Sequence, residues 1–343
     1  MERLMATHRE IRLRTRPERG LPAPEHLALV RTALPVPAPG EVLVRNRWFA
    51  VSAALRTLIG GGVKDAPFPP VEPGDPLVGA AVGEVVSAPD GSGLRPGDLV
   101  SHWQGWREYA TPSAAGCTPL GDTLPDPVAH LSQGWTAYAA LTRGAEVRRG
   151  DTVLVTGGAG AVGTMAGQIA RLLGAGRVIG STGSPAKADR LVAGLGYDAA
   201  LVRGAPVPFA AQLADAAPGG IDVLLDTVGG EQLSAAVAAA RPGARAVLVG
   251  ALSGQLDPAG TGTTARVELD SYPLVLKRVS LRGFSPLDHP ESEAEWRSRF
   301  GDWLRAGAIT FPHVRVAGMD RAAEALREVM EGRHIGAVVV ELP

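Results

Sequence analysis

Residues 152–163 read Thr-Val-Leu-Val-Thr-Gly-Gly-Ala-Gly-Ala-Val-Gly, and this stretch decides the fold. An apolar run ends in a glycine turn, and a helix-like segment follows over 164–173. Gly158, Gly160 and Gly163 fit the G-x-G-x-x-G pattern of dinucleotide-binding units. These glycines permit, in order, the tight turn, a close approach of the pyrophosphate, and packing of helix on strand. We predict a dinucleotide site here; a purely structural glycine turn is the alternative.

The segment after the next strand indicates which dinucleotide is bound. NAD sites usually place an acidic residue about 20 positions past the first glycine, to bind the ribose hydroxyl. The window 178–187 contains no acid, but it contains Ser181, Thr182, Ser184 and Lys187, and Arg203 follows. A 2′-phosphate requires donors and positive charge, so we expect NADP(H). The alternative is that Lys187 is only a solvated helix residue.

Composition excludes several classes of protein. The chain has 343 residues, 45% of them hydrophobic, which suffices for two domains with apolar cores. Its net charge of −1 does not favour binding to nucleic acid. No apolar run approaches the roughly 18 residues that a membrane span needs, and the first residues are polar without an apolar signal region. We therefore expect a cytoplasmic protein that binds neither nucleic acid nor membrane.

The cysteine and histidine pattern argues against a metal. Cys117 is the only cysteine, so a cysteine-rich zinc site is excluded. The seven histidines are scattered, without a pair at helical spacing. We expect no structural or catalytic metal.

Two patterns divide the chain. Residues 1–128 are proline-rich and strand-like, typical of a mostly β, barrel-like domain. Over 129–310 strands and helices alternate, which is typical of a doubly wound parallel sheet. Expected strands are 152–156, 177–180, 199–202, 221–226 and 246–250, and expected helices are 132–142, 164–173, 186–195, 209–216 and 231–239. Residues 311–343 again resemble the first domain, with a helix over 320–330 and a strand over 335–341. We predict an α/β Rossmann domain inserted into the β domain.

Several motifs, in this order, carry a family resemblance. They are Pro39–Val44, Arg95–Val100, Gly105–Tyr109, Gly134–Tyr138, Gly157–Gly163, Gly183–Lys187, Asp226–Gly230, Gly250–Ser253, Arg282–Phe284 and Gly332–Gly336. Together they cover nearly the whole chain. The chain resembles the zinc-independent medium-chain dehydrogenase/reductases, and among them the NADP-dependent alkenal/alkenone double-bond reductases. The resemblance implies a GroES-like barrel as the first domain.

The glycine fingerprint, the window 178–187 without an acidic residue, and the family resemblance together predict the residues that bind the cofactor. They are Thr136, Gly158, Gly160, Ala161, Val162, Gly163, Ser181, Thr182, Ser184, Lys187, Arg203, Thr227, Gly250, Ala251, Leu252, Ser253, Phe284 and His334. The chain also departs from the family. Residues 51–56 replace the family's D-P-Y-M-R segment, Val202 stands at a frequent tyrosine position, and asparagine is usual at positions 227 and 334.

The substrate side is predicted from few residues. Ser52 lies in the altered segment, and Trp103 and Trp135 are candidates to line a pocket for a large apolar substrate. Trp48 and Trp106 are expected to pack in the core. His102 is a possible second donor, although a core histidine is the favoured interpretation.

The resemblance implies hydride transfer from NADPH to the β-carbon of an α,β-unsaturated carbonyl compound, with charge developing on the carbonyl oxygen. The family's tyrosine position is Leu276 here. Tyr272 lies four residues earlier, so it shares a helix face with that position and is the candidate catalytic donor. Pro273 favours a place for Tyr272 at the helix mouth. A surface or packing tyrosine is the alternative.

Other functions stay open. They are quinone or ketone reduction on the same scaffold, a non-catalytic NADPH-binding protein, and an enzyme that has abandoned redox chemistry. The partner is expected to be a small-molecule substrate, an apolar enone or enal. The strand over 246–250 is expected toward one edge of its sheet, where relatives join two sheets, so we predict a C2 homodimer.

Overall fold

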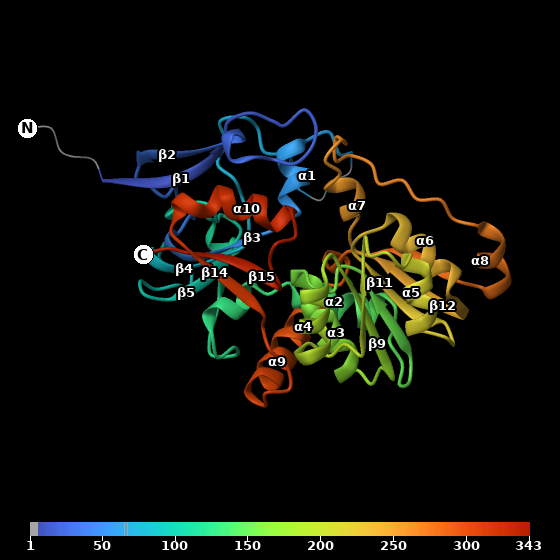
Figure 1. Cartoon of the computed structure of the whole chain (residues 1–343). Coiled ribbons are helices and arrows are strands. Elements are labelled where there is room, and N and C mark those ends of the chain that lie inside the picture. The colour runs from blue at the N-terminus through green and yellow to red at the C-terminus, as the bar shows by residue number, and fades with distance from the viewer. Residues whose placement is uncertain (1–5, 65, 67) are drawn as a thin grey trace, which may run out of the picture.

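The computed structural model describes residues 6–64, 66 and 68–343. Two large sheets organise the molecule, one in each of two bodies that lie side by side (Figure 1). The first body contains both chain ends, because its sheet combines strands from the beginning and the end of the sequence. The second body is built from the middle of the chain and is therefore inserted into the first.

The inserted body has a six-stranded parallel sheet in the order β10-β9-β8-β11-β12-β13. Its strands are β8 (Thr152–Val155), β9 (Arg177–Thr182), β10 (Ala199–Val202), β11 (Ile221–Asp226), β12 (Ala240–Leu248) and β13 (Ser280–Gly283). Successive side chains of a strand point to opposite faces. Val153 and Val155 accordingly enter one apolar core with α3 (Ala161–Leu172) and α4 (Pro185–Gly194). Leu154 enters the other, with α5 (Phe209–Ala216) and α6 (Gly230–Ala238).

The first body has a sheet in the order β14-β15-β3-β4-β5-β7, with β6 also paired to β3. These strands are β3 (Leu43–Val51), β4 (Ala81–Ser87), β5 (Leu99–His102), β6 (Tyr109–Ala110), β7 (Thr118–Pro119), β14 (His313–Ala317) and β15 (Ala337–Glu341). The hairpin of β1 (Thr7–Leu13) and β2 (Leu27–Ala33), α1 (Leu55–Gly60) and α10 (Ala322–Met330) pack on it. The last strand, β15, pairs antiparallel with β3, which closes the first body around the insertion.

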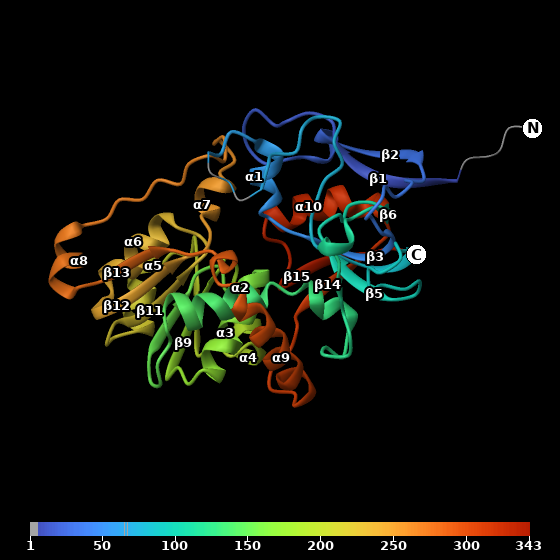
Figure 2. The ribbon, with the colours of Figure 1, turned by 180° about the vertical axis from the view of Figure 1, so that it is seen from behind.

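Four further helices complete the inserted body. α2 (Gly134–Ala139) continues into a π-helical turn over Ala140–Gly144 and packs against α9 (Glu291–Arg305). α7 (Leu252–Gln255) faces the first body, and α8 (Ser271–Lys277) stands at the opposite end, as Figure 2 shows from behind. The segment between α7 and α8 runs along the outside of the body (Figure 1).

The predicted fold class is confirmed: a Rossmann-type parallel sheet is inserted into a mostly β domain of GroES-like type. One detail differs from the expectation. The strand predicted over 246–250 belongs to β12, which spans Ala240–Leu248 and lies one position inside the sheet. β13 forms the edge instead. Within the described residues, no helix is long and apolar enough to cross a membrane.

Candidate active site

The glycine loop between β8 and α3 leaves no room for side chains at its centre. Gly157 has a φ of +63°, a conformation that favours glycine. A Cβ added to Gly163 would lie 2.3 Å from the Gly157 carbonyl oxygen and 2.6 Å from the Gly158 Cα. Both clashes are with backbone, so the close packing of α3 on the turn requires glycine at position 163.

The start of α3 is open to an anion. Gly160 is its exposed N-cap residue and has no side-chain cap. The first N–H groups of a helix, here those of Ala161, Val162 and Gly163, lack partners within the helix and point to its positive dipole end. A pyrophosphate is the group that such a glycine turn accommodates. The residues present therefore fit a dinucleotide.

Ser181 supports this loop from β9. Its Oγ accepts a hydrogen bond from the Gly157 N–H at 3.0 Å and donates to Gln232 Oε1 at 2.5 Å. The side chain is 1% exposed. The hydroxyl predicted to contact the cofactor is thus already used to hold the turn, and Gln232 in α6 is a supporting residue that the sequence did not indicate.

A buried carboxylate fixes the next loop. Asp226 is fully buried at the end of β11, where it accepts from Thr156 Oγ1 at 2.5 Å and from the N–H groups of Val228 and Gly229 at 3.0–3.1 Å. Thr227 donates through Oγ1 to the Thr156 carbonyl at 2.9 Å. The Thr227 hydroxyl is therefore part of the support between β8 and β11. Sequence reasoning missed the structural role of Asp226, although it lies within the quoted motif.

The loop after β12 packs directly on that support. Leu252 and Ser253 donate their N–H groups to the carbonyls of Thr227 and Val228, at 3.1 and 2.8 Å. A Cβ on Gly250 would lie 2.9 Å from the Thr227 oxygen. The two loops predicted to line the cofactor, 226–230 and 250–253, are therefore one packed unit at the carboxyl ends of neighbouring strands. Ligands of parallel α/β sheets bind at this end.

The residues predicted for a 2′-phosphate gather beyond β9. Ser184 is the N-cap of α4 and makes no side-chain cap bond, so its hydroxyl remains available. Lys187 directs its Nζ to the carbonyls of Gly332 and His334, the latter at 3.0 Å, and partial burial lowers its pKa. The Arg203 guanidinium lies 3.6 Å from the position that a Cβ of Gly183 would take. Thr182 pairs with Val202 beside them.

Lys187 therefore also connects the two bodies, because Gly332 and His334 belong to the turn between α10 and β15. Gly336, in the same turn, donates its N–H to the Ala159 carbonyl at 2.9 Å. The His334 ring approaches Glu328 at 2.9 Å. The C-terminal turn thus lies against the glycine loop, so a cofactor held by this loop would contact both bodies.

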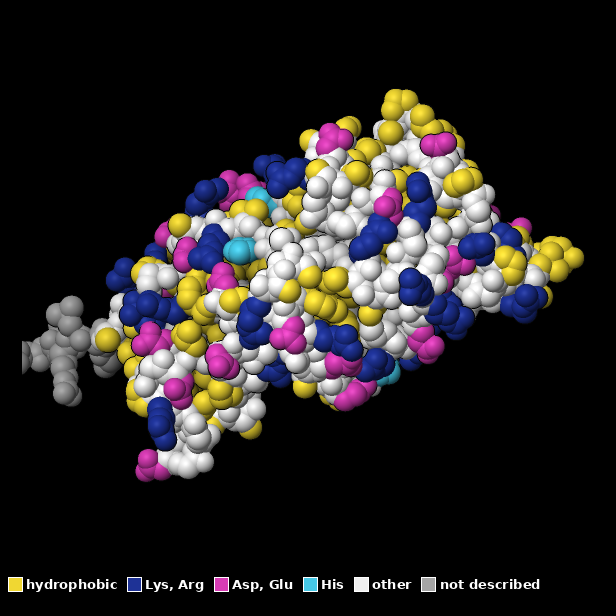
Figure 3. All heavy atoms as spheres, turned by 90° about the horizontal axis from the view of Figure 1, so that it is seen from below, with side chains coloured by type: hydrophobic (Ala, Val, Ile, Leu, Met, Phe, Trp, Pro, Cys, Tyr) yellow, Lys and Arg dark blue, Asp and Glu magenta, His cyan; other side chains and the backbone are white. Residues whose placement is uncertain are grey.

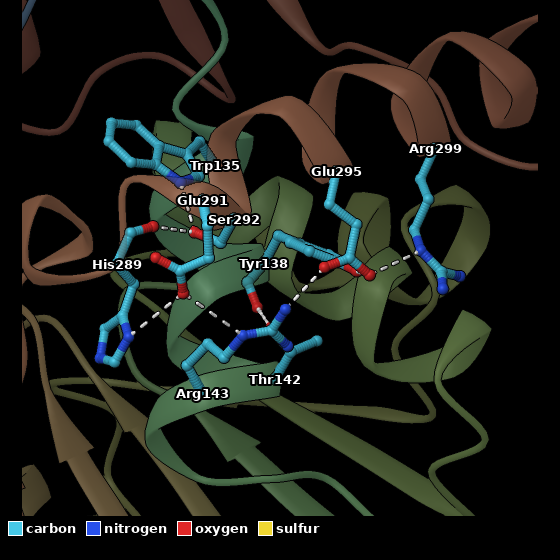
Figure 4. A network of polar contacts seen from close by, with 9 residues as sticks. All are labelled: Trp135, Tyr138, Thr142, Arg143, His289, Glu291, Ser292, Glu295 and Arg299. Carbon is cyan, nitrogen blue, oxygen red and sulfur yellow. Dashed lines mark hydrogen bonds and ion pairs between the residues drawn. The ribbon is translucent and has the colours of Figure 1, made fainter.

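A polar network fixes the wall formed by α2 and α9 (Figure 4). Trp135 donates from Nε1 to Ser292 Oγ at 2.8 Å, and Tyr138 donates to Glu295 Oε1 at 2.5 Å. Arg143 pairs with Glu295 at 2.7 Å. Burial and the bond to Glu295 raise the pKa of Tyr138 to about 12, so the phenol stays protonated. The polar end of Trp135 is therefore turned toward α9, and Thr136 beside it is half-buried.

Phe284, which follows β13, lies on the other side of the wall formed by α2 and α9. Its ring stacks on His289 with centroids 5.2 Å apart, and its edge approaches Gly144, where an added Cβ would lie 3.0 Å away. Its N–H donates to the Leu248 carbonyl at 2.9 Å. Phe284 is thereby held at the carboxyl end of β12, next to the loop that begins at Gly250.

On the first body, Ser52 lies at the boundary between the two. Its Oγ accepts from Ala54 N–H at 3.2 Å and from Gln133 Nε2 at 3.4 Å. Trp103 is 60% exposed and packs on Phe68, with ring centroids 5.3 Å apart. This exposed aromatic pair contrasts with Trp106, which is fully buried in the core.

His102 is a core histidine rather than a second donor at the site. It is 3% exposed, its Nε2 lies 2.8 Å from Asn46 Oδ1, and its Nδ1 accepts from the Gln104 N–H at 3.1 Å. Burial lowers its pKa to about 4, so the ring is neutral. With Nε2 donating and Nδ1 accepting, both nitrogens are occupied by protein groups.

Arg56 is a buried charged residue whose structural role the sequence did not indicate. It is 1% exposed and donates from NH2 to the Thr261 carbonyl at 2.6 Å. Gly20 donates to the Gly260 carbonyl at 2.8 Å close by. Burial lowers the pKa of Arg56. The segment after α7 is thereby attached to the first body, and it encloses one side of the boundary between α1 and α7.

Tyr272 lies away from all these groups within its own chain. It occupies the first turn of α8, is 68% exposed, and its N–H is capped by Asp270 at 2.9 Å. Leu276, at the family's tyrosine position, is 58% exposed on the same helix. Both views of the ribbon place α8 at the end of the molecule opposite the first body (Figures 1 and 2). The candidate donor is therefore not brought together with the cofactor loops of its own chain.

Cys117 is buried, and burial raises the pKa of its thiol to about 11. Among residues 6–64, 66 and 68–343, no group of three or more histidine, cysteine, aspartate or glutamate side chains is arranged to hold a metal.

Comparisons with known proteins match this architecture. Residues 9–120 match the family described as N-terminal domain of oxidoreductase, and residues 161–300 match the family described as zinc-binding dehydrogenase. The NADPH-dependent curcumin reductase of Escherichia coli is 30% identical over 339 residues, which are 96% of this chain and 95% of the relative. The chain belongs to the zinc-independent alkenal/alkenone reductases of the medium-chain dehydrogenase/reductase family.

Other members of the family extend the likeness. The NADP(+)-dependent 2-alkenal reductase of Nicotiana tabacum is 27% identical over 305 residues, covering 88% of this chain and 87% of its own. The structure of CurA from Vibrio vulnificus superposes with a TM-score of 0.88 at 30% identity, covering 98% of this chain and 99% of CurA. A second CurA structure, in complex with NADPH, has a TM-score of 0.87. The family resemblance noted in the motifs is therefore confirmed.

Proposed function

We propose that this protein transfers a hydride from NADPH to the carbon–carbon double bond of an α,β-unsaturated carbonyl compound. That it is an NADP(H)-dependent oxidoreductase follows from its family, whose members include the curcumin and 2-alkenal reductases. The reduction of an enone or enal is the narrower part of the proposal. The relatives named for such reactions support it at about 30% identity or less.

Two features carry the cofactor assignment: a glycine loop with no space for side chains, and a cluster of basic and hydroxyl side chains beyond β9. Gly163 forms the first and Lys187, with Ser184 and Arg203, the second. The ammonium of Lys187 rests on two carbonyls, which are weaker partners than a phosphate dianion. A 2′-phosphate offered to Lys187 would therefore replace these contacts with charge-assisted ones.

When bound, NADPH supplies the hydride, and the protein supplies orientation and electrostatics. The loops 226–230 and 250–253 and Phe284 would hold the nicotinamide end at the carboxyl edge of the sheet. The wall of α2 and α9, with Trp135 and Thr136, would face it from one side and α1 with Ser52 from the other. Charge that develops on the substrate oxygen needs one donor aimed at it.

The substrate side favours an apolar molecule. Trp103 and Phe68 expose a pair of aromatic faces on the first body. Residues 51–56 lack the aromatic and acidic side chains of the family's D-P-Y-M-R segment, which leaves Ser52 and Ala54 there. We propose that this alteration widens the site and that large apolar enones are accepted.

Quinone reduction is the second candidate, and one observation favours it. Leu276 replaces the family's tyrosine, and Tyr272 is remote within the chain. A quinone accepts hydride to give a stabilised aromatic oxyanion, so it depends less on a positioned donor than an enolate does.

Product analysis separates the two candidates. The purified protein is incubated with NADPH and, separately, a 2-alkenal, a long-chain enone and a 1,2-quinone. We expect the saturated aldehyde or ketone to form in step with NADPH consumption, with slow or no turnover of the quinone. Turnover of the quinone alone would replace the proposed reaction with the second candidate.

A further inference from the structure

The turn that leads from β3 into α1 carries a hydroxyl group with an undirected proton. Ser52 is half-buried, and its Oγ accepts from the Ala54 N–H at 3.2 Å and from Gln133 Nε2 at 3.4 Å. A hydroxyl has two lone pairs that accept and one proton that it donates. Both lone pairs are occupied here, and Ser52 Oγ donates to no acceptor among the described residues. Its proton is therefore available to a ligand.

Contacts on two sides place this hydroxyl at the boundary between the bodies. Gln133 directly precedes α2, which belongs to the wall described above. Gln255, the last residue of α7, donates from Nε2 to Thr57 Oγ1 in α1 at 3.1 Å, and α7 begins within the cofactor loop 250–253. Figures 1 and 2 show α1 beside α7 at this boundary. Ser52 therefore lies between the wall and the loops proposed to hold the nicotinamide end.

The sequence around Ser52 departs from the family pattern in a way that adds a donor. When Arg56 is aligned with the arginine of D-P-Y-M-R, the aspartate falls on Ser52 and the tyrosine on Ala54. An ionised carboxylate only accepts hydrogen bonds, whereas a serine hydroxyl also donates one. Ala54 is exposed and ends at its Cβ, so the aromatic ring of the family pattern is missing beside the hydroxyl.

A second departure removes a donor. Leu276 stands at the family's tyrosine position and has no O–H group, and Tyr272 lies far from the cofactor loops of its own chain. The hydroxyls of Ser181 and Thr227 already donate to protein acceptors. The loss of a phenol at position 276 is thus accompanied by the gain of a hydroxyl donor at position 52.

The surroundings favour a local donor over a long-range field. On the face drawn in Figure 3, basic and acidic side chains are interspersed, and the net charge of the chain is −1. Negative charge on a substrate oxygen must therefore be stabilised by groups in direct contact with it. A hydroxyl that accepts two hydrogen bonds is a stronger donor than an isolated one, because hydrogen bonds in a chain polarise one another.

We propose that the Ser52 hydroxyl donates a hydrogen bond to the carbonyl oxygen of the substrate, and that Gln133 positions this hydroxyl. The proposal rests on the reductase function proposed above. The hydride forms the new C–H bond at the β-carbon, and the electrons of the double bond shift until the carbonyl oxygen carries the negative charge of an enolate. Ser52 stabilises this charge and keeps its proton. The α-carbon takes a proton from water as the C=O bond forms again.

Gln133 acts through the hydroxyl and not on the substrate. Its Nε2 donates to Ser52 Oγ, so the O–H bond of Ser52 has to point away from the amide. A carboxylate at position 133 would accept the proton of Ser52 instead and withdraw it from the substrate. The direction of one hydrogen bond therefore determines whether Ser52 is a donor at the site.

Infrared spectroscopy tests the contact without turnover. A saturated long-chain ketone, labelled with ¹³C at the carbonyl, is bound to the protein in the presence of NADP⁺. Because a donated hydrogen bond weakens the C=O bond, its stretching frequency should be lower in the wild type than in Ser52→Ala. The matched control Thr57→Val removes the hydroxyl of the second amide–hydroxyl pair at the boundary and should match the wild type. Equal frequencies in the wild type and Ser52→Ala would overturn the proposal.

Steady-state kinetics with a long-chain enone test the role in the reaction. Ser52→Ala should lower kcat about 10- to 100-fold and change KM less than about threefold, because the bond strengthens as charge develops. Ser52→Thr keeps a hydroxyl and should recover most of kcat. Thr57→Val should stay within about twofold of the wild type. A normal kcat in Ser52→Ala would overturn the role of the hydroxyl.

Substitutions of Gln133 test the direction of the hydrogen bond. Gln133→Glu should lower kcat about as much as Ser52→Ala and raise the C=O frequency to the same value, although the hydroxyl is still present. Gln133→Leu, which has a similar size and no polar side-chain atom, should cost less than about tenfold in kcat. Greater activity of Gln133→Glu than of Gln133→Leu would overturn the positioning role. These variants also keep the proposal testable if circular dichroism shows that Ser52→Ala does not fold.

The outcomes separate this proposal from the proposed function. If the wild type reduces no enone, the proposed function is contradicted, and the infrared comparison still shows whether Ser52 contacts the carbonyl oxygen. A large loss of kcat in Tyr272→Phe without one in Ser52→Ala would assign the donor to Tyr272 and overturn the proposal. A frequency shift that depends on Ser52, together with a loss of kcat in Ser52→Ala, supports it.

Discussion

An added Cβ at Gly163 would lie 2.3 Å from a backbone oxygen, whereas Trp103 on the first body leaves 60% of its surface to solvent. The cofactor side of the site is a set of close backbone contacts that side chains such as Ser181 and Asp226 hold in place. The proposed substrate side consists of the exposed aromatic pair Trp103 and Phe68 and the altered segment around Ser52. The residues proposed to hold the cofactor are therefore tightly packed, whereas Trp103, which is proposed to contact the substrate, is open to solvent.

The largest expected effect tests the close packing of the cofactor side. Gly163→Val should weaken NADPH binding at least about 100-fold, or 2.7 kcal/mol, because the side chain has no space between α3 and the turn. The matched control is Gly194→Ala in α4, where an added Cβ finds nothing within 4 Å. Fluorescence titration measures both affinities, with circular dichroism to verify folding. Binding by Gly163→Val within threefold of the wild type would contradict the tight-packing account.

The next effect tests whether the polar core of the first body is structural. Burial holds the pKa of His102 near 4, against 6.5 for a free histidine, so the unfolded chain takes up a proton first as the pH falls. The stability contributed by the neutral ring is complete above about pH 6.5 and is lost between there and pH 4. Between pH 7 and pH 5 this group removes about 2 kcal/mol of unfolding free energy.

When the pH falls from 7 to 5, the unfolding free energy of His102→Gln should therefore decrease by about 2 kcal/mol less than that of the wild type. Urea unfolding at both pH values measures this difference. The starting stability of the variant should be lower, because the contacts to Asn46 and Gln104 are altered. The pH profile of kcat should be unchanged. A shifted kcat profile would mean that His102 takes part in the reaction and would place a titrating group on the substrate side.

A substitution of Lys187 tests the part of the cofactor side that is proposed to bind the 2′-phosphate. Lys187→Ala should weaken NADPH binding about tenfold, or 1.4 kcal/mol, and leave the affinity for NADH unchanged. The reason is that only the 2′-phosphate, which NADH lacks, is expected to reach the ammonium. Lys277→Ala, a lysine that donates to the Ala238 carbonyl on α6, is the matched control. An equal loss for both cofactors would show that Lys187 acts through the C-terminal turn alone.

The smallest effect is expected on the substrate side. Trp103→Ala should raise KM about three- to tenfold for a bulky apolar enone and less than twofold for a short alkenal, because only the larger substrate reaches the exposed pair with Phe68. Trp48→Phe, which removes a donor to Glu341 within the sheet, is the control and should change neither KM. If Trp103→Ala leaves both KM values unchanged, the exposed pair does not contact substrate.

The sequence predicts the elements of the Rossmann sheet well where glycine and proline residues separate them. β10, α5 and β11 have the expected bounds, because each is a short apolar element between turn residues. β13 and α9 were not expected. The four residues of β13 are all exposed and show no alternation, and α9 is rich in charged residues around its few buried aromatics, such as Trp296 and Phe300.

In the site, too, the sequence predicts only what a local pattern determines. The glycine turn could be predicted because local geometry determines its shape, and the contact of Lys187 with a 2′-phosphate stays a prediction. The hydroxyl of Ser181 faces the turn rather than open space, which depends on Gln232 from a distant helix. The place of Tyr272 depends on the position of α8 relative to the sheet edge, and that is a tertiary property with no local sequence signal.

The central claim is reduction of a conjugated double bond by hydride from NADPH, and isotope transfer tests it most directly. The protein is given NADPH deuterated at the transferred position and a long-chain enone, and the product is analysed by mass spectrometry and NMR. The account predicts a saturated ketone with one deuterium at the β-carbon. Deuterium at the carbonyl carbon of an allylic alcohol, or no deuterium in any product, would contradict it.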